Sequence, residues 1–291
     1  MQRSDRALPA GCATRPVLRF ERGQRTEDDD RLAEEVPVAM HFNGESFAVM
    51  MATPDDLEDF ARGFALTEGK VESLDDIEAI EVREVLEGIT VNVRTFASPS
   101  PTGLAPTAEV GANPVGDAPR RQLPGRSGCG ICGSRELEDV VRHPEPVGTG
   151  PTVTPDAIER ALEMLRATQP INAFTGSVHA AGWALPDGTL LTVREDVGRH
   201  NALDKLIGAL HHNEHTIEGG LLVISSRASY EMVSKAVRAG VSVLAAVSAP
   251  TALAIDLARS AGLCLVGFAR ESGFNVYTHP ERLQANDKRD D

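Results

Sequence analysis

Val241-Ser242-Val243-Leu244-Ala245-Ala246-Val247 is a nearly continuous apolar run in the C-terminal half of the chain. Such a run is typical of a strand that is buried on both faces, as in a parallel sheet covered by helices on both sides. Similar runs alternate with amphipathic helical segments around it, which indicates an α/β domain. The sequence predicts, in order, helix 199–210, strand 221–225, helix 230–239, strand 241–247, helix 251–261 and strand 263–268.

Helix and hairpin signals precede this alternation. Thr154-Pro155-Asp156 is typical of a helix start, because the hydroxyl can cap the helix, proline fits its first turn and an acid suits its positive end. Two apolar stretches within 178–193 flank the turn sequence Pro186-Asp187-Gly188 and predict a hairpin. We therefore predict that residues 151–285 form a three-layer α/β domain that binds a ligand.

The N-terminal third contains a smaller unit. Asn43-Gly44 lies between two alternating stretches and predicts a type I′ hairpin. Thr53-Pro54-Asp55-Asp56 predicts a helix start, with the threonine as the hydroxyl cap. Residues 31–96 are therefore expected to form a small α+β domain. Residues 1–30 are polar and end in a run of acids, so we predict a mobile tail there.

Composition limits the partners. The chain has 291 residues, 41% of them apolar, and a formal net charge of −14. Such a negative charge argues against nucleic acid or an anionic membrane as the main partner. The first residues lack the apolar run of a signal peptide, and the longest apolar stretch is far too short to span a bilayer. We expect a cytoplasmic protein.

Half of the cysteines lie in Gly128-Cys129-Gly130-Ile131-Cys132-Gly133. The six prolines and four glycines of residues 97–126 leave no periodic pattern, so residues 97–150 are expected to be a flexible loop that carries this motif. Without a secretory signal, a C-x-x-C pair favours reduced, reactive thiols over a structural disulfide.

Two other interpretations of Cys129 and Cys132 stay open at this point. They could be half of a zinc site or a passive pair. A closed zinc site needs four ligands, and no second C-x-x-C or closely spaced histidine pair follows. We therefore predict no metal site. Of the other cysteines, Cys12 lies in the predicted tail and Cys264 in an apolar strand, where cysteine behaves as a small hydrophobe.

Polar loops follow three predicted strands of the α/β domain. They are 225–229, 248–251 and 267–273, and two of them contain an arginine, Arg227 and Arg270. In open α/β sheets, ligands bind beyond the carboxyl ends of the strands, where helix N–H groups receive phosphates. Serine and threonine at these positions could also serve only as helix caps. Three such loops at one edge favour a nucleotide-like anion.

Functional side chains also gather in Glu195-Asp196-Val197-Gly198-Arg199-His200-Asn201, between a strand and a helix. A role as helix cap would account for Asp196 at this position. It would not account for Arg199 and His200, which can bind a polar ligand or transfer protons. His179, in the preceding hairpin, is interpreted as a core histidine.

Five separated motifs extend over about residues 33–283. They are Ala33-Glu34-Glu35-Val36-Pro37-Val38-Ala39, Cys129-Gly130-Ile131-Cys132-Gly133, the run from Glu195 to Leu206, the run from Ser225 to Val233, and Val276-Tyr277-Thr278-His279-Pro280. Together, and in this order, they resemble the formate dehydrogenase accessory sulfurtransferases, the FdhD family.

The resemblance implies a sulfurtransferase that accepts sulfane sulfur from a cysteine desulfurase as a persulfide. It implies that Cys129 carries the persulfide and that Cys132 is the nearby second thiol. The acceptor would be the molybdenum bis(molybdopterin guanine dinucleotide) cofactor, or its tungsten form, which formate dehydrogenase requires. It also implies a cytidine-deaminase-like fold for the C-terminal domain.

The cofactor-binding residues that we expect come from the resemblance and from the loops described above, and GDP should serve as a surrogate ligand. They are Phe268, Ala269, Arg270, Glu271, Ser272, Gly273, Ser226, Arg227, Arg199 and His200. Whether two chains pair as a homodimer is left open.

Two other functions compete with this one. A zinc deaminase needs His-x-Glu followed by Pro-Cys-x-x-Cys, but here the cysteine pair precedes His179, and Ala181 stands where the glutamate should be. Deamination is therefore excluded. The remaining alternative is a non-catalytic chaperone that binds the cofactor for formate dehydrogenase without moving sulfur.

Overall fold

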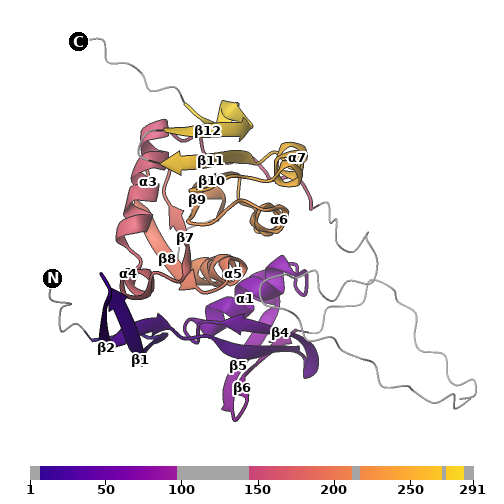
Figure 1. Cartoon of the computed structure of the whole chain (residues 1–291). Coiled ribbons are helices and arrows are strands. Elements are labelled where there is room, and N and C mark those ends of the chain that lie inside the picture. Colours follow the sequence, from indigo (N-terminus) through magenta and orange to yellow (C-terminus); the bar gives the residue numbers. More distant parts are fainter. Residues whose placement is uncertain (1–6, 97–143, 212–216, 271–272, 285–291) are drawn as a thin grey trace, which may run out of the picture.

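A computed structural model describes residues 7–96, 144–211, 217–270 and 273–284. The described residues form a six-stranded, a four-stranded and a two-stranded sheet. Figure 1 shows helices packed between and around the two larger ones. Cys129 and Cys132 lie outside the described residues, as do Glu271 and Ser272. No helix in the described part of the chain combines the length and the apolar character needed to cross a membrane.

The C-terminal domain is built on a six-stranded sheet of order β12-β11-β10-β9-β7-β8. Strands β9, β10 and β11 are parallel, whereas β12, β7 and β8 are antiparallel to their neighbours. The predicted hairpin is confirmed as β7 and β8. The strands are β7 (His179–Ala184), β8 (Leu190–Asp196), β9 (Leu221–Ile224), β10 (Val243–Ala246), β11 (Cys264–Arg270) and β12 (Gly273–Thr278).

Helices cover both faces of this sheet, so the three-layer prediction is confirmed. One apolar core lies between the sheet and α5, α6 and α7, and a second lies between the other face and α3. Thr154 caps α3 as predicted, accepting from the Ala157 N–H at 3.2 Å. The helices are α3 (Pro155–Ala167), α4 (Pro170–Thr175), α5 (Arg199–Leu210), α6 (Tyr230–Arg238) and α7 (Ala252–Ser260). The cytidine-deaminase-like topology stays a prediction.

The N-terminal domain has a four-stranded sheet of order β4-β3-β6-β5 with α1 (Leu57–Thr67) on one face. Asn43-Gly44 forms the predicted hairpin turn, with positive φ at both residues. Phe60 and Phe64 of α1 fill the core between helix and sheet. The strands are β3 (Val36–Phe42), β4 (Glu45–Ala52), β5 (Ile77–Val85) and β6 (Gly88–Thr95).

The start of α1 differs from the prediction. Thr53 does not cap the helix; Asp56 holds the N-cap position in a left-handed conformation and makes no side-chain cap bond. Thr53 is fully buried, and its N–H and hydroxyl groups make hydrogen bonds to the C-terminal domain. A residue that suits a cap by type is used here for a contact with a partner 143 residues away in the sequence.

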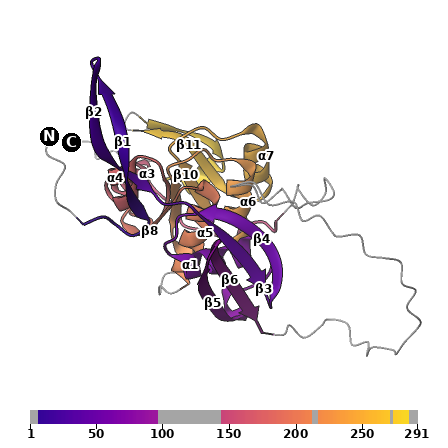
Figure 2. The same cartoon turned by 60° about the horizontal axis from the view of Figure 1, so that its bottom comes forward.

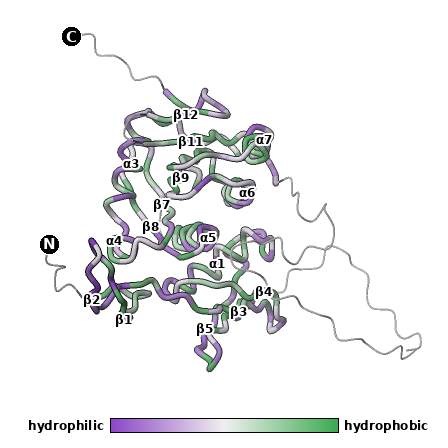
Figure 3. The backbone as a smooth tube through the Cα atoms, in the orientation of Figure 1, coloured by the Kyte–Doolittle hydropathy of each residue, from purple (hydrophilic) through white to green (hydrophobic). Residues whose placement is uncertain are grey.

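The predicted tail is wrong for residues 12–30. Two ten-residue strands, β1 (Cys12–Glu21) and β2 (Gln24–Ala33), form an antiparallel ribbon that Figure 2 shows projecting from the body. Its turn, Arg22-Gly23, has positive φ at both residues, as a type I′ turn requires. Figure 3 shows hydrophilic residues along much of β2, and its run of acids is the reason that a tail was predicted. In the ribbon these acids are paired across the strands, and Arg19 of β1 lies 3.4 Å from Asp28 of β2.

The two domains are joined by close packing of α1 on α5. A Cβ added at Gly63 of α1 would lie 1.8 Å from the carbonyl oxygen of Asp204, and one added at Gly208 of α5 would lie 1.9 Å from that of Asp59. Only glycine permits this approach. Beside it, buried Lys235 contacts Asp204 and Glu68, each at 2.9 Å. The predicted domains 31–96 and 151–285 therefore share a buried, partly charged interface.

Candidate functional site

The three polar loops lie together at one edge of the C-terminal sheet. The parallel strands β9, β10 and β11 end there, and two hydrogen bonds link the loops that follow them. The Phe268 N–H donates to the Ser248 carbonyl at 3.2 Å, and the Thr251 N–H donates to the Ala228 carbonyl at 3.1 Å. The predicted juxtaposition of the loops is therefore present. Thr251 acts as a helix cap, accepting from the Ala254 N–H at 3.3 Å.

The turn between β8 and α5 lies at the same edge. His179 at the start of β7 is paired with Asp196 at the end of β8, and Ser225 after β9 accepts from the Ala180 N–H at 2.8 Å. Arg199 and His200, the first two residues of α5, are thereby brought toward the loop that contains Ser226 and Arg227. Ser226 is buried and donates to the Arg227 carbonyl at 3.1 Å, whereas Arg227 is exposed.

Both acids of the motif between β8 and α5 have structural partners. Glu195 accepts from the N–H groups of Ile171 and Asn172 in the first turn of α4, at 2.8 and 2.9 Å. Burial raises the pKa of its carboxyl, against the lowering effect of these two bonds and of Lys205. Asp196 is fully buried and lies 2.8 Å from Lys205 Nζ. Neither acid is available to a ligand.

Arg199 and His200 keep buried nitrogen atoms without hydrogen-bond partners in the described structure. These are Arg199 Nε and both ring nitrogen atoms of His200, Nδ1 and Nε2. His200 is buried, and its Nε2 lies 2.7 Å from Glu231 Oε2 on α6, within ion-pair distance but outside hydrogen-bond geometry. Buried polar groups without partners are uncommon in native proteins, so they mark this part of the edge as a place where a ligand or water would bind. Glu231 lies in the motif from Ser225 to Val233, but nothing in the sequence marked it as a site residue.

His179 belongs to this cluster and is only half-buried, so it is not the core histidine predicted from sequence. Burial lowers the pKa of its imidazole, and the charges of Arg199 and His200 lower it further, against Asp196. A lower pKa keeps the ring neutral near pH 7. The β7–β8 hairpin, which the sequence predicts, places His179 opposite Asp196 and so close to Arg199.

The end of β11 is irregular. Phe268 has φ of 54°, which is rare for a bulky side chain, and the pairing with β12 shifts between Gly267 and Arg270. Phe268 is 44% exposed and Ala269 is buried. Gly267 is tightly packed, since an added Cβ would lie 2.8 Å from Pro250 Cδ. The bulge therefore presents the Phe268 ring beside the three loops.

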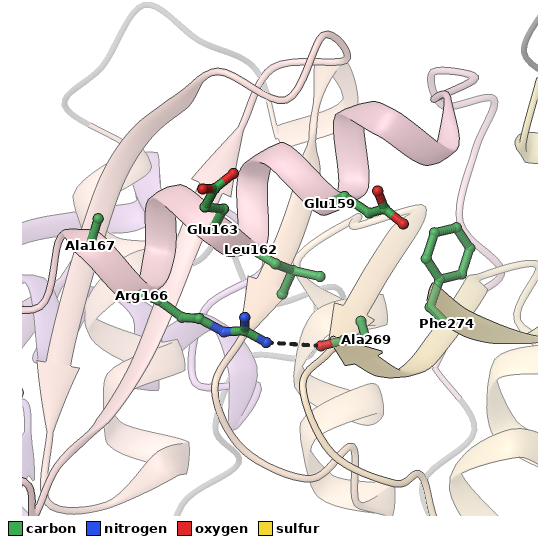
Figure 4. A pocket seen from close by; sticks show the side chains of 7 residues that line it. All are labelled: Glu159, Leu162, Glu163, Arg166, Ala167, Ala269 and Phe274. Atoms are coloured by element: carbon green, nitrogen blue, oxygen red, sulfur yellow. Dashed lines mark hydrogen bonds between the residues drawn. The ribbon is translucent and has the colours of Figure 1, made fainter. Parts of the chain in front are cut away.

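A pocket of about 500 Å³ lies between α3 and the β11–β12 hairpin (Figure 4). In the close-up, Glu159 extends toward Phe274, while Arg166 reaches Ala269 and donates to its carbonyl at 3.5 Å. The pocket thus combines an aromatic ring with carboxylate and guanidinium groups. Its lining residues are Glu159, Leu162, Glu163, Arg166, Ala167, Ala269 and Phe274.

Comparison with known proteins gives the family. The model of the FdhD/NarQ family matches residues 33–284. The chain belongs to this family. A protein named sulfur carrier protein FdhD from Xanthomonas oryzae pv. oryzae is 49% identical over 280 residues, which cover 96% of this chain and 95% of the relative. One with the same name from Cupriavidus necator is 47% identical over 278 residues, covering 96% and 92%.

A solved structure supports the fold of this FdhD/NarQ family member. The crystal structure of a proposed formate dehydrogenase accessory protein from Desulfotalea psychrophila superposes with a TM-score of 0.68 at 23% identity. The match covers 94% of this chain and 99% of that one. The mixed α/β architecture is therefore shared across most of both chains.

The two cysteines that the structure describes in this FdhD/NarQ chain are poor nucleophiles. Cys264 is buried in β11, and burial raises the pKa of its thiol to about 12. Burial also raises the pKa of Cys12, and the charges of Glu195 and Glu34 raise it further. A thiol with a raised pKa carries little thiolate. Among the described residues, no three His, Cys, Asp or Glu side chains are placed to hold a metal ion.

Proposed function

We propose that the chain is a sulfurtransferase that takes sulfane sulfur from a cysteine desulfurase and delivers it to the bis-guanine-dinucleotide cofactor of formate dehydrogenase. The observation that carries this proposal is membership of the FdhD/NarQ family together with the Cys129-Gly130-Ile131-Cys132 motif. Relatives that cover nearly the whole chain are named sulfur carrier proteins. The molybdenum or tungsten cofactor is the substrate here, and the partners are the desulfurase and the dehydrogenase.

The chemistry assigned to Cys129 is persulfide formation. Its thiolate attacks the outer sulfur of the donor's persulfide, a new sulfur–sulfur bond forms, and the donor's cysteine leaves as a thiolate. Cys132 is assigned to assist release. The raised pKa values of Cys12 and Cys264 support the choice of Cys129 and Cys132 over the other two cysteines.

Mass spectrometry tests this assignment. The protein is incubated with a cysteine desulfurase and cysteine, and peptides are searched for an added sulfur atom. The addition is expected on Cys129 in the wild type and nowhere in Cys129→Ala, and the variant should fail to restore formate dehydrogenase activity in a strain that depends on this protein. Full activity with Cys129→Ala would instead favour the cofactor-binding chaperone.

A guanine-nucleotide site at the sheet edge completes the proposal. Arg199 and Arg227 supply positive charge for a diphosphate, and the neighbouring buried nitrogen atoms lack partners. Phe274 offers a ring for stacking a base, and the Glu159 carboxylate can accept hydrogen bonds from guanine nitrogen atoms. Ala269, which follows the Phe268 bulge at the end of β11, also lines this pocket.

Calorimetry with GDP tests the placement. Arg199→Ala and Arg227→Ala should each weaken binding by about tenfold or more, because hydrogen bonds to charged groups contribute ~1.5–3 kcal/mol. Glu159→Gln should reduce the preference for GDP over ADP. Arg83→Ala serves as the control, since Arg83 is exposed on the N-terminal sheet and pairs with Glu81. If none of the three site substitutions alters GDP affinity or the preference for GDP over ADP, the nucleotide binds elsewhere.

A further inference from the structure

Thr53 makes its polar contacts across the domain boundary. Its N–H donates to Asp196 Oδ2 at 3.0 Å, and its hydroxyl oxygen accepts from the Val197 N–H at 3.2 Å. Its carbonyl accepts from Lys205 Nζ at 3.0 Å. The carbonyl also accepts from the Asp55 N–H at 2.8 Å within the N-terminal domain. Each polar group of this buried residue thus has a bond to the turn between β8 and α5 or to the helix that follows.

The turn that Thr53 contacts has few other means of fixing its shape. The N-cap of α5 is Gly198, which has no side chain with which to cap the helix. Asp196 Oδ1 accepts from the Gly198 N–H at 2.7 Å and from Asn201 Nδ2 at 2.9 Å. Asn201 Nδ2 also donates to the Met51 carbonyl at 2.8 Å, again in the N-terminal domain. The start of α5 is therefore held by Asp196 from its own domain and by Met51 and Thr53, at and just after the end of β4, from the N-terminal domain.

Arg199 and His200 follow this turn directly. The Val197 N–H that bonds to the Thr53 hydroxyl lies two residues before Arg199, so a rotation of that peptide would displace the arginine. The N–H would also be left without an acceptor. A guanidinium that is displaced or rotated binds its ligand more weakly, because hydrogen bonds weaken steeply with distance and angle.

We propose that Thr53 is a positioning residue for Arg199 and His200, so that the N-terminal domain sets the geometry of the ligand site in the C-terminal domain. This inference rests on the proposed function, in which Arg199 and His200 contact the nucleotide. Thr53 itself is buried and touches no ligand.

The test compares three variants. Thr53→Val keeps the shape of the side chain and removes the hydroxyl acceptor, and Thr53→Ser restores it. Thr67→Val is the matched control, because Thr67 is a second buried threonine at the same interface whose hydroxyl contacts Asp204 and Lys235, each at 2.8 Å, and not the turn. The full-length chain is used throughout.

Two measurements are made on each variant. In calorimetry, Thr53→Val is expected to bind GDP about fivefold more weakly than the wild type, because a displaced Arg199 makes a weaker hydrogen bond to the phosphate. Thr53→Ser and Thr67→Val should stay close to the wild type. In NMR titration, Thr53→Val is expected to change the pKa of His179, which responds to the charge of Arg199. Thr67→Val should leave that pKa unchanged.

The outcomes separate the two proposals. Equal weakening of GDP binding by Thr53→Val and Thr67→Val would show that Thr53 acts only through stability. Wild-type GDP affinity in Thr53→Val would also overturn the inference. If the wild type binds no GDP, the nucleotide site of the proposed function fails. The His179 titration then decides by itself whether Thr53 positions Arg199.

Discussion

Lys205 Nζ lies 2.8 Å from Asp196 Oδ2, and both side chains are fully shielded from water. Burying two charges is expensive, and their attraction offsets the cost only when hydrogen bonds satisfy the remaining donors and acceptors. Here Thr53 contributes to both partners, through its N–H to the carboxylate and its carbonyl to the ammonium. The pair therefore depends on both domains.

Lys205→Met should lower the free energy of unfolding by about 3–5 kcal/mol, because it leaves the Asp196 carboxylate buried without its cation. The double variant Asp196→Asn/Lys205→Met should recover part of this loss. Urea denaturation followed by circular dichroism measures both. Arg259→Met is the control, since Arg259 pairs with Asp256 on the surface and such pairs contribute ~0–1 kcal/mol. Similar losses in Lys205→Met and Arg259→Met would contradict the prediction.

Gly63→Ala and Gly208→Ala should each separate α1 from α5 and lower the free energy of unfolding by at least ~2 kcal/mol, within the range for overpacking. The added methyl would overlap a backbone carbonyl, which cannot rotate away. Gly148→Ala is the matched control, because nothing lies within 4 Å of its added Cβ. Thermal denaturation of the three proteins makes the comparison. A Gly63→Ala protein as stable as Gly148→Ala would show that the interface can adjust.

Cys264 should resist alkylation in the folded protein at pH 8 and react once urea is added, because burial raises the pKa of its thiol to about 12. The same shift makes stability depend on pH. The contribution of Cys264 is complete below its ordinary pKa of 9.0 and is lost as the pH rises toward about 12, since the unfolded thiol ionises first. Cys264→Ala should remove this component of the pH dependence. Rapid labelling of native Cys264 at pH 8 would refute its burial.

Arg199→Gln should raise the pKa of His179 toward its ordinary value of 6.5, because the nearby guanidinium disfavours the protonated ring. NMR titration of the imidazole measures the change, and Arg227→Gln should have no such effect. Because the folded pKa is lowered, the unfolded state binds the proton more tightly, so stability falls as the pH drops below 6.5. His179→Gln should lessen that fall. If Arg199→Gln leaves the pKa of His179 unchanged, Arg199 has no electrostatic effect on His179 and the prediction is wrong.

Signals carried by neighbouring residues predicted much of the fold. The apolar runs identified β9, β10 and β11, and Asn43-Gly44 and Pro186-Asp187-Gly188 located two hairpins. Parallel strands place their carboxyl ends at one edge, so the meeting of the three polar loops also followed from the sequence. In each case the information lies within a few residues or in a general rule of sheet geometry.

Contacts between distant segments could not be predicted in this way. The residue type of Thr53 suits a helix cap, and nothing near it indicates partners in the turn after β8. The acids of β2 resemble a tail until the strand is paired with the arginines of β1. Only the Arg22-Gly23 turn gave a local signal for that ribbon. Glu231 joins the candidate site through the packing of α6 beside α5, which no local sequence pattern indicates.

The close approach of α1 and α5 also limits how the family can vary. Gly63 and Gly208 each face a backbone carbonyl of the opposite helix, and Glu68 shares Lys235 with Asp204. A larger residue at either glycine would require the backbone of the opposite helix to shift. Chimeras that join the first half of one family member to the second half of another should therefore fold poorly, unless residues 51–68 and 194–208 are exchanged together. We therefore expect the two domains to evolve together as one unit.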